Sequence, residues 1–380
     1  MNLSYWERDF LLGKPDVIII GAGIVGLSCA LSLKKTNPTL DILVLERGVL
    51  PCGASTKNAG FACFGSITEL IDDVTNNGTD NMLSLVEQRW KGLQLLQQNL
   101  GAKNIDFQAL GGYELFTPND LQAYPYLSDQ IETYNKLLHP IFNQDVFSLA
   151  NEKIAAFGFN SISSLLFNKF EGQINTGLMM KVLLNGVRAA GVQVINSVTV
   201  NTIIEEADEV RLDTSIGLIK TKQVAVCTNA FTKLLLPEIA VTPGRAQVLI
   251  TNPIKNLSIQ GTFHYDRGYY YFRNINNRLL IGGGRNIDPE GETTTEMETT
   301  EVIMHEIKQL LNHVILPNTD YTIDTSWAGI MGLGKSKKVI VKNHSERIAV
   351  GVRLGGMGVA IGSEIGNELA TLVRKKILSE

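Results

Sequence analysis

The chain has 380 residues, of which 44% are hydrophobic, which is enough for two domains with separate cores. Its 34 basic and 38 acidic residues give a net charge of −4 without a block of like charges, which argues against nucleic acid as the main partner. The apolar runs are too short to span a membrane and the first 14 residues lack a signal-peptide pattern, so a cytoplasmic location is expected.

The most informative motif lies near the N-terminus, where residues 16–34 are typical of a buried strand, a glycine-rich turn and a helix. In a GxGxxG turn, Gly21 permits the tight bend, Gly23 lets a pyrophosphate approach, and Gly26 lets the helix pack closely. The helix N-terminus then offers N–H groups and partial positive charge to phosphates. Glu46 follows the next strand, where an acid binds an adenosine ribose. This βαβ unit predicts a dinucleotide site for FAD or NAD.

The remaining predicted elements follow from periodicity and turn residues. The first half of the chain is predicted to contain a loop at 49–66, a helix at 67–100, short strands with amphipathic helix at 102–165, a helix at 176–191 and a strand at 192–196. β-meander runs are predicted next, at 199–205, 209–213 and 217–227. The last part is predicted to contain strands at 246–251, 268–273 and 278–282, a helix at 293–314, a strand pair at 338–342 and 346–352, and a final helix at 358–377.

These elements predict an α/β fold with a Rossmann-like dinucleotide-binding domain, in which a β-meander accompanies the parallel sheet. An α+β substrate domain with an antiparallel sheet is predicted to be inserted into it. The expected boundaries are 15–85, 166–235 and 325–380 for the dinucleotide-binding domain, and 86–165 and 236–324 for the substrate domain.

Neither the cysteines nor the histidines are arranged as metal ligands. The four cysteines, Cys29, Cys52, Cys63 and Cys227, form no CxxC pair, and Cys29 and Cys227 are expected in the core. The five histidines are scattered without the spacing of a metal site. No metal is expected.

A second glycine-rich turn, at residues 351–362, precedes the final apolar helix. A second helix N-terminus directed at the cofactor suits a flavin, because it stabilises negative charge at the N1–C2=O edge of the reduced ring. The sequence therefore favours FAD over NAD.

With these motifs, the chain resembles the D-amino acid oxidase-like FAD-dependent oxidoreductases, a family that includes glycine, sarcosine and γ-glutamylputrescine oxidases. The resemblance extends over nearly the whole chain. It rests on the GxGxxG unit and on residues 53–61, 171–175, 227–230, 280–285, and 327–332 with the C-terminal turn.

The resemblance implies a non-covalently held FAD and a defined set of contacts. The implied cofactor-binding residues are Gly21, Ala22, Gly23, Ile24, Gly26, Glu46, Arg47, Ala54, Ser55, Asn58, Ala59, Gly60, Val200, Thr228, Asn229, Gly356, Met357, Gly358 and Val359.

The resemblance does not define the substrate pocket, because two family features are missing. Met331 stands where glycine and D-amino acid oxidases carry a carboxylate-binding arginine, and Leu280 stands where sarcosine oxidases carry the lysine that promotes reaction with oxygen. Either another arginine (Arg245, Arg273, Arg285 or Arg353) replaces the missing one, or the substrate lacks a carboxylate there. The pocket candidates are Phe61, Phe64, Tyr269, Tyr271, Arg273, Trp327 and Met331.

Strand alternation places Tyr269, Tyr271 and Arg273 on one face, where they either line the pocket or pack the sheet. The expected reaction is oxidation of the C–N bond of a small amine or amino acid by hydride transfer to flavin N5, giving an imine that hydrolyses. No side-chain base is required if the amine binds neutral. The electron acceptor is oxygen or another molecule.

Other functions remain open. One is a flavin dehydrogenase acting on a 2-hydroxy acid or a polyol with an acceptor other than oxygen. Another is a flavoprotein subunit that requires a partner subunit. An RNA-modifying flavoenzyme is disfavoured by the acidic charge balance.

Overall fold

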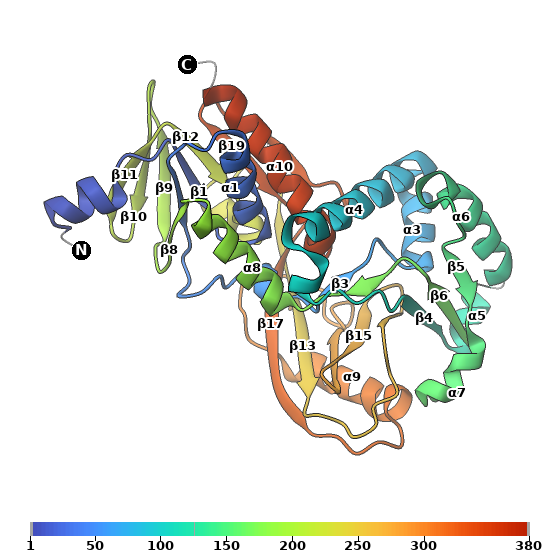
Figure 1. Cartoon of the computed structure of the whole chain (residues 1–380). Helices are drawn as coiled ribbons and strands as arrows, with labels where there is room; N and C mark the ends of the chain where they lie inside the picture. Colours follow the sequence, from blue (N-terminus) through green and yellow to red (C-terminus); the bar gives the residue numbers. More distant parts are fainter. Residues whose placement is uncertain (1–2, 125, 378–380) are drawn as a thin grey trace.

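The computed structural model describes residues 3–124 and 126–377, so the last three residues of the domain expected to end at 380 lie outside the described part. Two large sheets organise the chain, with helices beside each (Figure 1). Within the described residues, no helix is both long and apolar enough to cross a membrane.

The first sheet has six strands in the order β18-β19-β12-β1-β2-β8. Its strands are β1 (Val17–Ile20), β2 (Ile42–Leu45), β8 (Gln193–Ile195), β12 (Gln223–Val226), β18 (Ile340–Asn343) and β19 (Ile348–Val352). All neighbours pair in parallel except β18, which runs antiparallel to β19 at the edge. The expected parallel sheet, resumed by the strand near 192–196, is confirmed.

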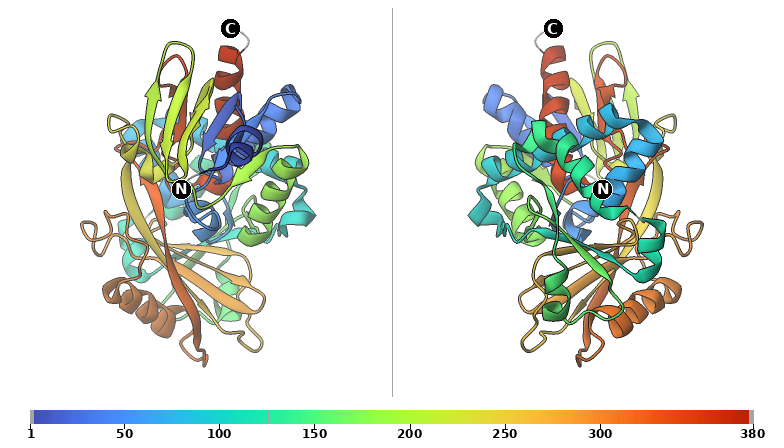
Figure 2. Two further views of the ribbon diagram at one scale, coloured as in Figure 1. Left: turned by 90° about the vertical axis from the view of Figure 1, so that its left-hand side faces the viewer. Right: turned by 90° about the vertical axis from the view of Figure 1, so that its right-hand side faces the viewer.

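Alternate residues of β1 face different layers, as the two faces of a strand must. Val17 and Ile19 pack against α1 (Ile24–Thr36), α8 (Thr176–Ala189) and α10 (Gly358–Ile377). Ile18 and Ile20 pack instead against the meander of β9 (Val200–Glu205), β10 (Val210–Thr214) and β11 (Gly217–Thr221). The meander stands beside the sheet in the side views of Figure 2. The six-stranded sheet is therefore buried on both faces, which explains its nearly continuous apolar strands.

The second sheet has eight strands in the order β17-β13-β16-β15-β14-β4-β6-β5. Its strands are β4 (Gly112–Phe116), β5 (Phe147–Leu149), β6 (Ser164–Asn168), β13 (Thr242–Thr251), β14 (Thr262–Tyr265), β15 (Tyr270–Ile275), β16 (Arg278–Gly283) and β17 (Ile323–Leu333). Only β4 and β14 pair in parallel, so the sheet is predominantly antiparallel.

One face of the eight-stranded sheet is packed with aromatic residues and covered by α9 (Glu301–Leu310) with the π-helix η5 (Leu311–Ile315). Phe263 and Phe272 stack there with ring centroids 4.6 Å apart. At the other end, α3 (Ile67–Asn77), α4 (Thr79–Leu100) and α6 (Leu127–Phe142) form a helical layer over β4, β5 and β6. The opposite face of the sheet is left to face the nucleotide-binding segments.

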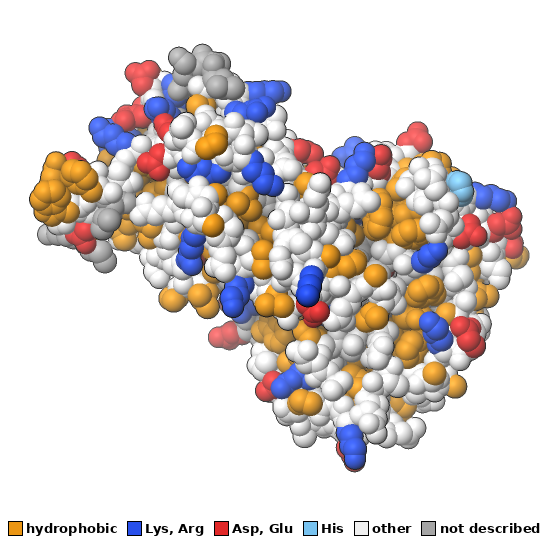
Figure 3. Space-filling view, in the orientation of Figure 1, with side chains coloured by type: hydrophobic (Ala, Val, Ile, Leu, Met, Phe, Trp, Pro, Cys, Tyr) orange, Lys and Arg blue, Asp and Glu red, His pale blue; other side chains and the backbone are white. Residues whose placement is uncertain are grey.

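The smaller elements complete the chain. They are η1 (Glu7–Leu12), α2 (Ala54–Lys57), the paired strands β3 (Phe61–Ala62) and β7 (Gly172–Gln173), η2 (Ala102–Ile105), α5 (Pro118–Ala123), η3 (Asn151–Lys153), α7 (Ile154–Phe157) and η4 (Asn229–Leu234). The N-terminal helical segment projects from the molecule, and its Tyr5, Trp6 and Phe10 are 54, 67 and 66% exposed (Figure 3). These three rings contact one another and form an apolar tip.

Among the differences between the predicted elements and the structure, three are large. The helix predicted at 67–100 is interrupted at Gly78, whose φ of 82° ends α3 before α4 begins. The meander run predicted at 217–227 is two strands, because β12 leaves the meander and joins the parallel sheet. The helix predicted from 293 begins at Glu301, because Thr300 is bound to Gln247 by its backbone N–H and its hydroxyl, at 2.8 and 2.9 Å.

Candidate active site

The nucleotide turn joins β1 to α1 with glycine at the positions where no side chain fits. Gly21 has a φ of 108°, in the left-handed region, and a Cβ on Gly26 would lie 2.0 Å from the carbonyl oxygen of Gly21. The backbone at this turn is therefore open to a ligand, and α1 starts directly behind it with Gly23 as its N-cap. This is the geometry that binds a pyrophosphate.

Glu46 lies at the end of β2 and is 6% exposed. Its carboxylate accepts hydrogen bonds from the Ala22 N–H at 3.0 Å and the Gly48 N–H at 2.9 Å. These bonds fix the carboxylate beside the nucleotide turn, where it can bind a ribose. The guanidinium of Arg47 lies 3.7 Å from the centre of the Phe231 ring.

The segment around α2 is tied to the nucleotide turn by hydrogen bonds. The Ser55 hydroxyl accepts one from the Ile24 N–H at 2.9 Å, and the Asn58 side-chain oxygen accepts from the Gly60 N–H at 2.9 Å. From the eight-stranded sheet, the Trp327 indole donates to the Lys57 carbonyl at 2.9 Å. The segment is therefore held between the two sheets.

The C-terminal glycine-rich turn directs the N-terminus of α10 at the same region. The Asn229 side-chain oxygen accepts a hydrogen bond from the Arg353 N–H at 3.0 Å, and the Gly355 N–H donates to the Gly332 carbonyl at 3.0 Å. Gly355 has a φ of 61°, and α10 begins three residues later at Gly358. The free N–H groups at the N-terminus of this 20-residue helix therefore lie at the cavity.

These segments line one cavity of about 1010 Å³, which is large enough for a dinucleotide and a small substrate. Most of the expected cofactor residues line it, namely Gly21, Gly23, Ile24, Glu46, Arg47, Ala54, Ser55, Asn58, Ala59, Gly60, Val200, Thr228, Asn229, Gly356, Met357, Gly358 and Val359. Ala22 and Gly26 lie behind this lining. The glycine turn, the ribose-binding acid and the second helix N-terminus fit FAD.

The expected substrate residues divide into two groups. Phe61, Tyr269, Tyr271 and Met331 line the cavity beyond the flavin segments. Burial raises the pKa of Tyr271 to about 12, so its phenol is neutral. The other three do not line it: Phe64 is fully buried among α3, α4 and α6, Arg273 lies behind Gly60, and Trp327 is bound to Lys57.

The alternative arginines also have different environments. Arg245 does not line the cavity and forms an ion pair with Glu292 at 2.7 Å. Arg353 lines the cavity, but its guanidinium donates to the backbone carbonyls of Lys338 and Ala240. Arg285 lines the cavity, 5.8 Å from the Tyr269 ring. Arg273 is 2% exposed and donates one long hydrogen bond, to the Gly60 carbonyl at 3.5 Å.

Several charged residues at the cavity were not expected from the sequence. Arg89, Glu69 and Asp73 come from the helical layer, and His264 comes from β14. Arg89 had a recognisable signal, because it occupies a buried position of α4 in series with Met82, Val86, Leu93 and Leu96. An arginine on an apolar helix face requires polar partners or a ligand.

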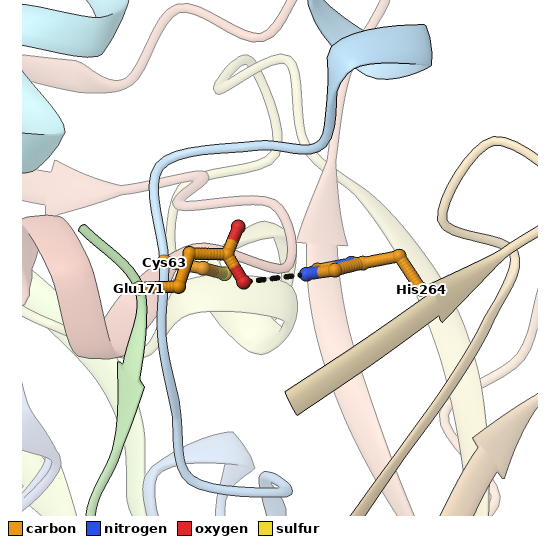
Figure 4. Close-up of side chains that lie close together, drawn as sticks. All are labelled: Cys63, Glu171 and His264. Carbon is orange, nitrogen blue, oxygen red and sulfur yellow. Dashed lines mark hydrogen bonds and ion pairs between the residues drawn. The ribbon is translucent and has the colours of Figure 1, made fainter. Parts of the chain in front are cut away.

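His264 is joined to Glu171 in the interior, as Figure 4 shows. Its Nε2 lies 2.9 Å from a Glu171 oxygen, and the Cys63 sulfur lies within 4.8 Å of both. Burial alone lowers the pKa of His264, but the charges of Glu171, Glu69 and Glu114 outweigh it and raise the pKa to about 9. Burial also raises the pKa of the Cys63 thiol well above its usual value. The group is thus an ion pair beside a neutral thiol.

Comparisons with known proteins agree with this geometry. Residues 16–372 match the family described as DAO, FAD dependent oxidoreductase. A probable oxidoreductase OrdL of Haemophilus influenzae is 22% identical over 94% of this chain and 82% of its own length.

Two solved structures share the fold. L-proline dehydrogenase from P. horikoshii has a TM-score of 0.74 and 19% identity, and covers 95% of this chain and 94% of its own. Iminodiacetate oxidase from Chelativorans sp. BNC1 has a TM-score of 0.75 and 17% identity, with 94% and 95% covered. The chain therefore belongs to the DAO family of FAD-dependent oxidoreductases, and FAD is its cofactor.

Proposed function

We propose that this enzyme oxidises the C–N bond of a small amine or amino acid. The observation that carries the proposal is the cavity beyond the flavin segments, which is lined by Phe61, Tyr271 and Tyr269 and is open to a small molecule. The named activities of the two structural neighbours, on proline and iminodiacetate, support a substrate whose nitrogen is bonded to the oxidised carbon. When bound, FAD supplies a hydride acceptor at N5.

The residues of this chain orient the substrate and exclude water. Phe61 packs edge-on against His264 and Tyr271, with ring centroids 5.4 and 5.7 Å away, and so presents an apolar wall to the reacting carbon. The neutral Tyr271 phenol adds a hydrogen-bonding group without a charge. His264 is protonated near neutral pH because its pKa is about 9, so it acts as a hydrogen-bond donor. A protonated His264 cannot take a proton from the substrate, so the substrate amine needs to arrive unprotonated.

The proposal includes a non-covalent FAD and an electron acceptor other than oxygen. Cys52 lies at the ribose end, with its sulfur 3.5 Å from Glu46, and Cys63 is a buried thiol. Leu280 is 5% exposed and packs with Ala59 and Val248, so no cation stands at that position. Release of all flavin on acid precipitation supports non-covalent binding of FAD. Rapid reoxidation of the reduced enzyme by air contradicts an acceptor other than oxygen.

The proposal also assigns FAD binding to a discontinuous domain of residues 15–85, 166–235 and 325–380, and substrate binding to 86–165 and 236–324. The six-stranded sheet supports this division, because all its strands lie within the three segments assigned to FAD binding.

The test is anaerobic reduction of the FAD-loaded protein with a panel of secondary amines, amino acids and 2-hydroxy acids. We expect amines or amino acids to bleach the flavin absorbance. Bleaching by hydroxy acids alone contradicts the proposal and favours a hydroxy-acid dehydrogenase. Bleaching that requires an added protein fraction favours a subunit of a larger complex.

A further inference from the structure

Three buried residues from separate elements line the cavity near the helical layer. Cys63 follows β3, Arg89 lies on α4, and His264 lies on β14. All three line the cavity and are buried, with exposures of 6, 3 and 6%. We call these residues the end wall.

Arg89 has more hydrogen-bond donors than partners. Its Nη1 donates to the Phe64 carbonyl at 2.6 Å, and among the described residues this is its one hydrogen bond. Its buried Nε has no partner in that part of the chain. Burial lowers the pKa of Arg89, whereas the nearby charges of Glu69 and Asp73 raise it. A guanidinium carries five N–H donors, and leaving buried donors unbonded costs about 1–3 kcal/mol each.

His264 contributes a second donor. Glu171 binds its Nε2, and the Glu171 carboxylate is itself held by Thr262 at 3.0 Å and Asn168 at 3.2 Å. The other ring nitrogen, Nδ1, has no hydrogen-bond partner among the described residues. As Figure 4 shows, the Glu171 carboxylate points at the edge of the imidazole ring, which fixes the ring against rotation. The imidazolium thus presents a fixed donor from a buried position.

We propose that Arg89 and His264 bind a carboxylate group of the substrate at the end wall. A carboxylate lying between the two side chains would accept a charge-assisted hydrogen bond from each cation. The carboxylates of Glu69 and Glu171 balance much of the positive charge, so a single negative charge fits better than a phosphate dianion.

This proposal rests on the proposed function and makes its substrate an amine that also carries a carboxylate. The carboxylate is bound from α4 and β14. Met331 on β17 cannot bind it, because a thioether has no strong hydrogen-bond donor. The substrate is therefore oriented from α4 and β14, and not from β17.

The experiment measures binding without turnover, so that it is independent of which bond the enzyme oxidises. Sodium propionate and the uncharged propionamide are titrated into FAD-loaded protein by isothermal calorimetry. We expect propionate to bind and propionamide to bind at least about tenfold more weakly, since a charge-assisted pair is about twice as strong as a neutral one. The Arg89→Met variant is expected to bind propionate at least about tenfold more weakly, and Arg89→Lys to recover part of the loss.

The matched control is Lys91→Met, two positions along α4, where Lys91 is exposed and paired with Glu87 at 2.6 Å. It is expected to bind propionate like the wild type. If Arg89→Met does not fold, His264→Asn and Arg89→Lys provide the test, and each is expected to weaken propionate binding several-fold. Equal binding of the two probes to the wild type, or unchanged propionate binding in the variants that fold, overturns the proposal.

A failure of the proposed function has a different signature. If only hydroxy acids bleach the flavin while propionate binding still depends on Arg89, the carboxylate site stands and the oxidised bond is reassigned. If amines bleach the flavin but Asp73→Asn abolishes ligand binding and Arg89→Met does not, Asp73 binds the ammonium group of the substrate, and the carboxylate proposal is wrong.

Discussion

Glu114 is a buried residue whose charge depends on its surroundings. Its carboxylate accepts hydrogen bonds from the Ser66 hydroxyl at 3.0 Å and from the Thr68 hydroxyl and N–H. Burial raises the pKa of Glu114 to about 7, and the bonds to Thr68 and Ser66 with the charge of His264 limit the rise. The folded protein therefore retains this proton at pH values where the unfolded chain has lost it.

This difference predicts a pH-dependent stability. Because the folded-state pKa lies above the usual value of 4.5, the contribution of Glu114 to unfolding free energy is present below about pH 4.5 and lost as pH rises to about 7. The Glu114→Gln variant has no such loss, so its stability relative to wild type increases between pH 5 and pH 8 (about the range of the transition). Urea unfolding at both pH values measures it, with exposed Glu152→Gln as control, and parallel pH profiles contradict it.

Gly26 gives a second prediction for a single residue. Its replacement by alanine puts a methyl group 2.0 Å from the Gly21 carbonyl oxygen, so helix α1 must move away from β1. We expect a destabilisation of about 1–3 kcal/mol and loss of most bound FAD. The ratio of flavin to protein absorbance after purification measures the effect.

A suitable control is Gly186→Ala, in the last turn of α8, where the nearest atoms are 3.7 Å away. This change is expected to retain FAD and to stabilise the protein by about 0.5–1 kcal/mol. Full flavin content in Gly26→Ala shows that the turn has other ways to accommodate a side chain.

Helices α4 and α10 cross at Gly92, where a Cβ would lie 2.0 Å from the Ala360 carbonyl oxygen. The crossing fixes the first turn of α10 at the FAD cavity, and it also fixes α4, which carries Arg89. Gly92→Ala is therefore expected to lower stability by about 1–3 kcal/mol and to weaken FAD binding, although residue 92 does not line the cavity.

Thermal unfolding with and without added FAD measures the effect of Gly92→Ala on stability and on FAD binding. If Gly92→Ala lowers the melting temperature without changing FAD affinity, the crossing supports stability alone. If Gly92→Ala changes neither the melting temperature nor the FAD affinity, the two helices separate easily.

The elements show where sequence reasoning succeeds. The final helix begins at 358 as predicted and continues to 377, the last described residue, because its apolar face and preceding glycines are local signals. The sequence pattern wrongly places β12 in the meander, because the partners with which a strand pairs cannot be read from its own residues. Its fully buried Gln-Val-Ala-Val pattern is nevertheless typical of a parallel strand. Residues 294–300 are rich in threonine, which disfavours helix, and Gln247 binds the end of this segment.

At the site, most residues expected from motifs line the cavity, whereas Arg89 and His264, which are recognised by burial, were not expected. The motif residues lie in contiguous segments with fixed spacing. Arg89 and His264 line one cavity because the helical layer meets the eight-stranded sheet, and the buried Nε of Arg89 has no partner among the described residues. Sequence spacing contains no information about such missing partners.

For the whole molecule, the FAD cavity joins both sheets, since it is lined by residues of the nucleotide turn, α10, β15 and β17. FAD binding is therefore expected to stabilise the entire fold. Saturation at 100 times the dissociation constant corresponds to about 2.7 kcal/mol. A melting temperature that rises with FAD concentration and much less with FMN, which lacks the adenosine that Glu46 is proposed to bind, is the expected result. Equal shifts with FMN contradict a role for Glu46.

The order of the strands has a consequence for the synthesis of the chain. Strand β1 lies between β2 and β12, and α1 packs against α10, so the first βαβ unit remains incomplete until the last helix has left the ribosome. During translation at about 5–20 residues per second, the apolar faces of β1 and α1 wait for partners for tens of seconds. The nascent chain is thus expected to need a chaperone, and ribosome-bound chains stalled before residue 358 should be sensitive to protease at β1 and α1.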